Sequence, residues 1–417
     1  MGQWRRMNNC GLLTSLIILL YPLFPFFYVS CELGHDDLSD ENIEVSVIET
    51  NIENELVRRY NSEITEIQYP NGNYSSSFIL NYLQDTTELR YDRPCPVILV
   101  IYPSSNDLEL QISVDFMFSD RVLKFQVPEG KDTIAIYNLI PSTIYYYRIV
   151  NNKHGHENVC ALGQFKTDGG VRMLFVDGIF NVRDNGGWTC FINDKFFSVK
   201  YGYLYRGSRL NNDGVSLSED DRRILLQENI GTDLDLRYDS EAGKIITSPL
   251  GPDVYYSRNY QTCANYCYGD VLNKDDYIRA AKLVINSIVE WGRPVYYHCA
   301  GGADRTGTFA FLIEGLLGVR EVDLAKDYEL TSLFPQLRSR IRTNPNYIQL
   351  VEELASINGN KTLEQEDFFL YFFHGTPGQK KDYKNPDGSQ SAYIEESVLK
   401  QFIVFMTGCT MEDLTFL

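Results

Sequence analysis

One stretch of the chain, residues 294–318, constrains the fold more than any other. It begins with an apolar, strand-forming run at 295–297 and then turns through a loop that contains two glycines. From 309 to 317 nearly every residue is apolar, which predicts a helix buried on most sides, and Gly318 is a helix stop signal. The pattern therefore predicts a strand, a glycine-bearing loop and a buried helix whose N-terminus faces Cys299.

This arrangement has a chemical consequence for Cys299 and Arg305. The first amides of a helix lack intrahelical partners, and together with the helix dipole they form an anion site. A cysteine that faces such a site has a lowered pKa and is a thiolate near neutral pH. The guanidinium of Arg305 offers two parallel donors to phosphate oxygens. A thiolate, an amide cradle and a guanidinium together favour nucleophilic attack on a phosphate monoester.

The segment 298–307, HCAGGADRTG, resembles the signature loop of the protein tyrosine phosphatase superfamily. Cys299 and Arg305 have the Cys-X5-Arg spacing of that loop, and Asp304 before the arginine resembles the bacterial branch. None of the other eight cysteines has an arginine six residues on. The alternative, a structural cysteine in a glycine turn, leaves the grouping of these polar residues unexplained.

The resemblance implies a role for each residue of the loop. Cys299 is expected to be the nucleophile, Arg305 to bind phosphate in the transition state, Thr306 to support the leaving thiolate, and His298 to support the loop. The phosphate is expected to lie against the loop residues Ala300, Gly301, Gly302, Ala303, Asp304 and Arg305. The chemistry requires no cofactor and no metal.

A general acid is also needed to protonate the leaving oxygen. The chain has no Trp-Pro-Asp loop, and by resemblance Asp304 is the candidate. Asp235 and Asp184 remain alternatives, and their other expected role is structural pairing with Arg237 or Arg183.

Residues 171–417 are expected to form the catalytic domain. The blocks 173–188 and 200–208 resemble the amino-terminal half of the same phosphatase family, in which an Asn-x-Arg-Asp-x-Gly-Gly segment precedes a Tyr-Arg hairpin. A helix is predicted at 217–228 and a strand at 232–236. This alternation predicts an α/β domain with a central, mostly parallel sheet and catalytic residues at the carboxyl ends of its strands.

Short β runs with turn residues between them fill residues 91–168 and predict a β-sandwich. The end of this segment, 137–167, resembles the last strands of a fibronectin type III domain. Cys95 and Cys160 flank the module and form either a disulfide or two free thiols. Cys263 and Cys267 can pair with each other or with the thiols at 190 and 409, and the sequence does not choose between these pairings.

Residues 1–31 are expected to be a targeting segment, because two arginines precede an apolar stretch at 12–27. Cys31, with a small residue before it, resembles a bacterial lipoprotein cleavage site and is the expected lipidation site; an uncleaved membrane anchor is the alternative. Residues 32–90 are a tether followed by an unassigned region. The expected location is therefore outside the cytoplasm of a bacterium, periplasmic or at the cell surface, with a lipid anchor in the outer or cell membrane.

The expected function is hydrolysis of a phosphate monoester through a cysteinyl phosphate, most simply by a protein-tyrosine or dual-specificity phosphatase. Ala300 and Ala303 stand where phosphoinositide-preferring relatives often carry a lysine, which favours singly phosphorylated substrates such as phosphotyrosine. The alternatives are a phosphoinositide or inositol phosphate phosphatase of the same fold, and a non-catalytic surface binding lipoprotein. The net charge of −18 excludes a general basic surface for nucleic acid.

Overall fold

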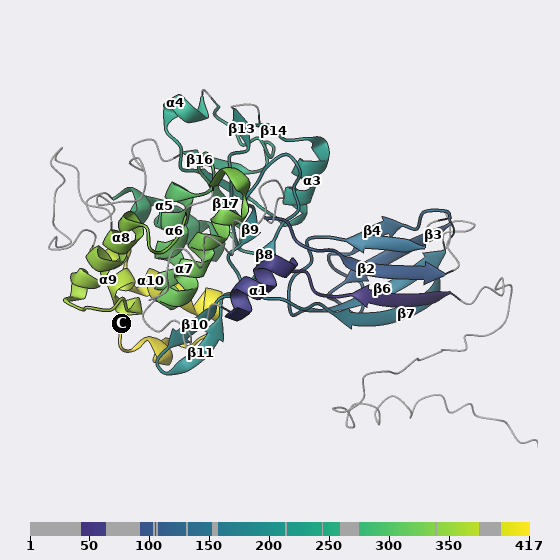
Figure 1. The fold of residues 1–417 in the computed structure, drawn as a ribbon, viewed down its shortest axis with the longest axis horizontal. Helices are drawn as coiled ribbons and strands as arrows, with labels where there is room; N and C mark the ends of the chain where they lie inside the picture. Colours follow the sequence, from purple (N-terminus) through teal and green to yellow (C-terminus); the bar gives the residue numbers. More distant parts are fainter. Residues whose placement is uncertain are drawn as a thin grey trace, which may run out of the picture.

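The computed structural model describes residues 43–63, 92–102, 105, 107–130, 132–151, 157–212, 215–243, 245–258, 275–337, 340–374 and 393–417. The expected targeting segment with Cys31, most of the tether region, and both Cys263 and Cys267 lie outside these residues. The described parts form a β region and a larger α/β region (Figure 1). Across these ranges, no helix has the length and apolar character needed to cross a bilayer.

Two antiparallel sheets make up the β region, with strand orders β1-β2-β5 and β4-β3-β6-β7. The strands are β1 (Glu44–Glu49), β2 (Val97–Tyr102), β3 (Leu108–Ser113), β4 (Leu123–Gln126), β5 (Thr133–Ile136), β6 (Ile144–Asn151) and β7 (Asn158–Lys166). Side chains alternate between the core and solvent, and both sheets contribute to one core, with Leu99 and Ile136 from one sheet and Leu110 and Ile149 from the other. The resemblance to a fibronectin type III domain stays a prediction.

Strand β1 comes from the segment that the sequence left unassigned. It pairs antiparallel with β2, so that Val45 lies opposite Ile101, and it forms an edge of the three-stranded sheet. The β region therefore starts upstream of residue 91, where the sequence placed its beginning.

The thiols at Cys95 and Cys160 are both free, which is one of the two alternatives left open by the sequence. Cys160 is exposed on β7 of the four-stranded sheet, whereas Cys95 precedes β2 of the other sheet. Cys190 and Cys409 are buried free thiols in the core of the α/β region.

The α/β region is built on a six-stranded sheet with the order β16-β15-β17-β12-β9-β8. The strands are β8 (Arg172–Met173), β9 (Arg183–Asp184), β12 (Leu204–Gly207), β15 (Thr232–Asp235), β16 (Tyr255–Arg258) and β17 (Val295–His298). The first four strands in that order run parallel, and β9 is antiparallel to both of its neighbours, β12 and β8. The predicted α/β region with a mostly parallel sheet is confirmed.

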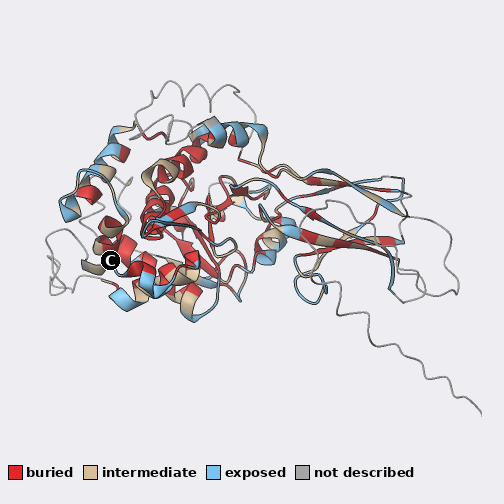
Figure 2. Ribbon diagram, turned by 90° about the horizontal axis from the view of Figure 1, so that it is seen from below, coloured by how far each residue is buried: buried red, intermediate tan, exposed pale blue. Residues whose placement is uncertain are grey.

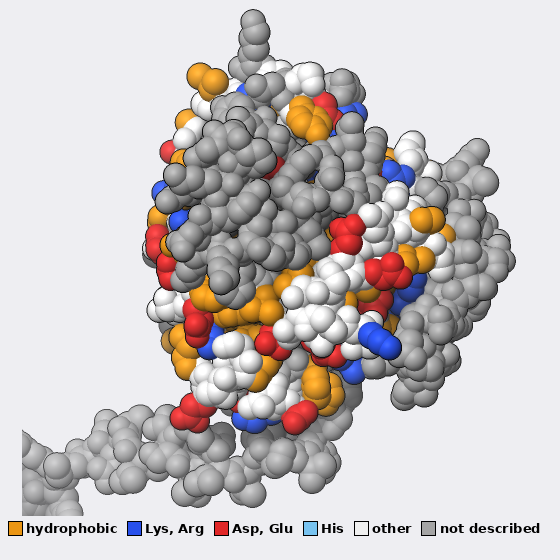
Figure 3. All heavy atoms as spheres, turned by 90° about the vertical axis from the view of Figure 1, so that its left-hand side faces the viewer, with side chains coloured by type: hydrophobic (Ala, Val, Ile, Leu, Met, Phe, Trp, Pro, Cys, Tyr) orange, Lys and Arg blue, Asp and Glu red, His pale blue; other side chains and the backbone are white. Residues whose placement is uncertain are grey.

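Helices cover this sheet. They are α3 (Glu219–Gln227), α5 (Asp276–Ile285), α6 (Asp304–Leu316), α7 (Glu321–Leu330), α8 (Pro345–Ala355), α9 (Gln365–His374) and α10 (Glu396–Thr407). Helix α6 lies against β12 and β17, and α7 and α9 pack on α6. Figure 2 shows that the central strands and the helices next to them are the most buried part of the region. The surface in Figure 3 carries apolar and acidic side chains next to one another, with a few basic ones.

A short helix, α1 (Glu55–Glu63), lies where the two regions meet (Figure 1). Its Val57 and Tyr60 are buried in a small core with Met173, Leu333 and Ile341 of the α/β region. The segment after β1 is thus part of the packing of the α/β region and not only a connection.

Candidate active site

The loop that follows β17 is placed at the carboxyl end of the central sheet. β17 lies between β15 and β12, and its last residue, His298, is in register with Asp235 on one side and Gly207 on the other. Residues 299–303 form the loop, and α6 begins at Asp304. The predicted strand, glycine-bearing loop and buried helix are all present, and this edge is where parallel sheets usually place ligands.

Cys299 lies at the N-terminus of α6 and is 3% exposed. Burial raises the pKa of its thiol, but the charge of Arg305 and hydrogen bonds from the hydroxyl and the amide of Thr306 outweigh burial, so that the pKa lies below its usual value. The Thr306 side chain is fully buried, and its hydroxyl finds no oxygen or nitrogen partner among the described residues. The site therefore favours a thiolate.

Gly302 fixes the shape of the loop. Its φ is +66°, and a Cβ atom there would lie 2.4 Å from the carbonyl oxygen of Gly207. Its own carbonyl accepts hydrogen bonds from Asn181 Nδ2 at 2.8 Å and from Arg206 Nη2 at 2.9 Å. The Gly302 carbonyl therefore ties the loop to β12 through Arg206 and to the turn before β9 through Asn181.

A buried network supports these contacts from behind the loop. Arg183 Nε donates to Asp327 Oδ1 at 2.7 Å, and Arg206 donates to the other oxygen of the same carboxylate. Arg183 Nη1 also holds the Asn181 side chain at 2.5 Å. Burial opposes ionisation of Asp327, but the two guanidinium groups keep its pKa below the usual value. The Asn-x-Arg segment at 181–183 thus braces the loop.

His298 is buried between two carboxylates of β15. Its Nε2 lies 3.0 Å from Asp233 Oδ1, and its Nδ1 lies 3.8 Å from Asp235 Oδ1. Burial lowers the pKa of the imidazole, but the carboxylates of Asp235 and Asp233 outweigh it and raise the pKa above its usual value. This position suits a charged imidazole that supports the loop.

Arg305 makes a two-point ion pair with Glu241 of α4 (Asp239–Ala242), with Nη1–Oε2 at 2.6 Å and Nη2–Oε1 at 2.8 Å. Nη1 also lies 3.4 Å from the carbonyl oxygen of Leu236, and the guanidinium carbon is 5.5 Å from the centre of the Tyr238 ring. Glu241 therefore takes the Nη1–Nη2 edge and fixes the plane of the guanidinium.

Asp304 also has an arginine partner that the sequence did not indicate. Arg340 Nε lies 3.1 Å from Asp304 Oδ1, and Arg340 Nη2 lies 2.9 Å from Oδ2. The Asp304 side chain is 12% exposed, and its charge acts on Cys299 by raising the pKa of the thiol. The candidate acid is thus near Cys299, at the first residue of α6.

The two alternative acids have structural partners. Asp235 is fully buried and pairs with Arg237 through both oxygens at 2.9 and 2.7 Å. The predicted pairing of Asp184 with Arg183 is wrong. Asp184 instead accepts a hydrogen bond from Arg172 Nη1 at 3.1 Å. Burial raises the pKa of Asp184 to about 6 although Arg172 opposes this, and its oxygens also accept from the amides of Gly186 and Gly202.

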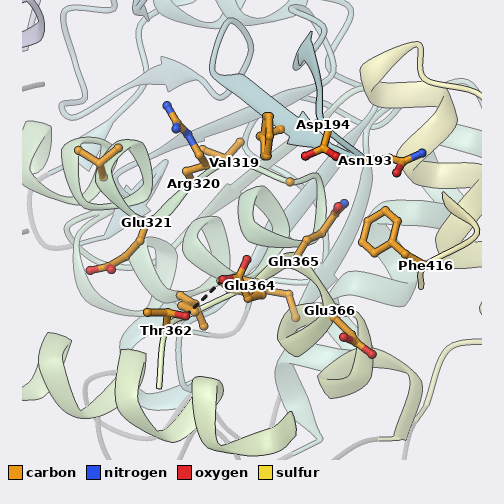
Figure 4. Close-up of a pocket in the computed structure, with 15 residues that line it drawn as sticks. Asn193, Asp194, Val319, Arg320, Glu321, Thr362, Glu364, Gln365, Glu366 and Phe416 are labelled. Carbon is orange, nitrogen blue, oxygen red and sulfur yellow. Dashed lines mark hydrogen bonds between the residues drawn. The ribbon is translucent and has the colours of Figure 1, made fainter. Parts of the chain in front are cut away.

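A separate pocket lies at the other end of α6 (Figure 4). It has a volume of about 590 Å³, and Gly318, Arg320, Gln365 and Phe416 are among the residues that line it. None of the loop residues lines it, so it is distinct from the candidate site. Within the described ranges, no group of three or more His, Cys, Asp or Glu side chains is arranged to hold a metal.

Comparison with known proteins gives one family match and one distant structural similarity. A sequence model described as the tyrosine phosphatase family matches residues 174–365, which include the loop at Cys299. The crystal structure of the Y102H variant of human DUSP28 is similar to this chain at 16% identity, covers 36% of this chain and 87% of that chain, and has a TM-score of 0.23. No curated protein matches the chain. Residues 174–365 are therefore a tyrosine phosphatase-like region.

Proposed function

We propose that the chain is a cysteine-dependent phosphatase that hydrolyses phosphate monoesters through a cysteinyl phosphate, with phosphotyrosine proteins or dual-specificity substrates as its targets. The observation that carries the proposal is the Cys299 thiol with a lowered pKa, at the N-terminus of α6 and beside Arg305. The similarity of residues 174–365 to tyrosine phosphatases supports it. A non-catalytic binding protein would need neither a lowered thiol pKa nor a braced loop.

In the proposed first step, the Cys299 thiolate attacks phosphorus and the bond to the leaving oxygen breaks. The guanidinium of Arg305 and the first amides of α6 stabilise the negative charge on the phosphate oxygens. Asp304 donates a proton to the leaving oxygen. A phosphocysteine and a neutral alcohol or phenol result.

In the second step, a water molecule attacks the phosphocysteine and Asp304 takes its proton. The sulfur leaves as a thiolate, and the Thr306 hydroxyl stabilises it. Inorganic phosphate is released, and Asp304 is again protonated for the next cycle.

The substrate is proposed to carry one phosphate. The loop offers Ala300 and Ala303 instead of an additional cation, and the Arg305 guanidinium is the group proposed to bind the single phosphate. Export and attachment to a membrane through a lipid on Cys31 are further parts of the proposal, supported by the sequence of residues 1–31 alone. Phosphate monoesters outside the bacterial cytoplasm would then be the substrates.

The proposal is tested by phosphate release from a panel of phosphotyrosine, phosphoserine and phosphothreonine peptides, phosphoinositides and inositol phosphates. We expect the tyrosine-phosphorylated peptides to be hydrolysed fastest, and Cys299→Ser to lose turnover of every member. Faster hydrolysis of phosphoinositides or inositol phosphates would contradict the proposed substrate. Absence of activity on the whole panel would contradict the proposed function.

A further inference from the structure

We infer that Arg340 is a positioning residue for Asp304, and that helix α1 holds Arg340 in place through a buried cluster of side chains. The inference deepens the proposed function and rests on Asp304 as the general acid. It begins with the two-point ion pair between Arg340 and Asp304, at 3.1 and 2.9 Å. Such a pair fixes both the position and the plane of the carboxylate.

The backbone of Arg340 is itself held on both sides of the residue. Its amide donates to Ser332 Oγ at 3.1 Å, and its carbonyl accepts from the same hydroxyl at 3.0 Å. Ser332 lies in the 3₁₀ turn Thr331–Leu333 that follows α7, so the segment with Arg340 is attached to the end of that helix.

Two residues further on, Arg342 ties the same segment to Glu329 of α7. Its amide and its Nε both lie 2.9 Å from Glu329 Oε1, and its Nη2 lies 2.7 Å from Oε2. The Tyr60 hydroxyl of α1 donates to Glu329 Oε2. Tyr60 and Glu329 are both 0% exposed, so these hydrogen bonds are shielded from water.

These contacts form a continuous chain from Tyr60 through Glu329 and Arg342 to Arg340 and Asp304. Helix α1 lies outside residues 174–365, the part that is similar to tyrosine phosphatases. A helix from the junction with the β region thus completes the support of the candidate acid.

A general acid must occupy the same position in each catalytic cycle. The backbone contacts of Arg340 keep the guanidinium nearby, so that the carboxylate returns to the same position after each cycle.

The test compares a good leaving group, p-nitrophenyl phosphate, with a poor one, phenyl phosphate, because proton transfer matters only for the poor one. Proton transfer by a positioned acid typically contributes about 10²–10⁴-fold. We expect Arg340→Gln to slow kcat for phenyl phosphate about tenfold and that for p-nitrophenyl phosphate less than about twofold. We expect Arg340→Lys to recover part of the loss, and Tyr60→Phe to show the same selectivity with a smaller loss.

Two matched controls keep the result specific. Arg223→Gln removes an exposed ion pair on α3, and Tyr201→Phe removes a hydroxyl that donates to the carbonyl of Gly170. In both variants, the ratio of kcat for phenyl phosphate to kcat for p-nitrophenyl phosphate should equal that of the unmodified protein. An equal loss on both substrates in Arg340→Gln would overturn the positioning role. A lower Tm without a changed ratio in Tyr60→Phe would overturn the link to α1.

The role of Asp304 is tested separately with Asp304→Asn. A selective loss on phenyl phosphate in this variant, without one in Arg340→Gln, would refute the inference and leave the proposed function intact. An equal loss on both substrates in Asp304→Asn would remove Asp304 as the acid and the inference with it.

Discussion

At the scale of single residues, the state of the Cys299 sulfur decides the chemistry. Burial in a protein normally raises the pKa of a thiol, as it does for the buried Cys190 of this chain. At Cys299 the charge of Arg305 and two hydrogen bonds from Thr306 reverse the direction of the shift. The contrast between the two cysteines comes from their surroundings and not from their exposure, since both are buried.

We expect the rate of alkylation of Cys299 by iodoacetate to reach its midpoint below about pH 8.5, the usual pKa of a cysteine. Only the thiolate reacts, so the rate rises with pH through the pKa, and a lowered pKa moves this rise to lower pH. The alkylated residue is identified by mass spectrometry of peptides after digestion.

In the same measurement, Thr306→Val should move the midpoint to higher pH, because the variant lacks the hydroxyl that lowers the pKa. A midpoint at or above that of an ordinary thiol in the unmodified protein would show that the loop does not stabilise the thiolate.

The sequence indicated the residues of the loop but not their partners. Cys299, Arg305 and Thr306 are close together in the chain, and their spacing alone pointed to one loop. Glu241 and Arg340 lie 64 and 36 residues from the side chains that they hold. No local pattern marks such a partner, because the contact depends on how the chain returns to the loop.

Among the helices and strands, the four-residue helix α4 fixes the position of the Arg305 side chain through Glu241. It follows β15 directly, and Asn212 Nδ2 holds it by hydrogen bonds to the carbonyl oxygens of Glu241 and Ala242 at 3.2 and 2.5 Å. Hydrogen bonds with Arg305 and the amide of Tyr238 lower the pKa of Glu241 although burial opposes them. The helix thus presents a charged carboxylate that aligns Arg305, the arginine that we propose binds phosphate.

We expect Glu241→Gln to reduce kcat/KM for p-nitrophenyl phosphate on the order of tenfold, because an amide cannot replace both charge-assisted hydrogen bonds to Arg305. Steady-state kinetics with Glu219→Gln as a control checks this, since Glu219 forms an exposed pair with Arg222 on α3. Activity above that of the unmodified protein would mean that Glu241 obstructs phosphate instead of aligning its ligand.

The sequence predicted a helix most readily where capping residues mark its N-terminus. The helix predicted at 217–228 is present as α3, and Ser218 and Asp221 form its capping box. Helix α5 ends at Ile285, and a π-helical turn follows it over Asn286–Glu290. The place of β1 in a sheet depends on pairing with β2, which local patterns do not reveal.

At the scale of the whole molecule, the two regions share polar contacts as well as apolar ones. Arg172 of β8 donates to both oxygens of Glu228 at 2.9 and 3.0 Å, and to the carbonyl oxygen of Asn138 in the β region at 2.6 Å. The sequence predicted a β-sandwich at 91–168 and a catalytic domain at 171–417 as two separate units. It could not show that α1 and Arg172 join them, because such contacts follow from tertiary packing.

In the proposed mechanism, this molecule transfers phosphate to Cys299 before water releases it. The most direct test is an acid quench during turnover of a radiolabelled phosphotyrosine peptide, followed by mapping of the labelled residue. We expect label on Cys299 of the unmodified protein and none in Cys299→Ser, which should also release no phosphate. Phosphate release by Cys299→Ser at the rate of the unmodified protein would contradict the account.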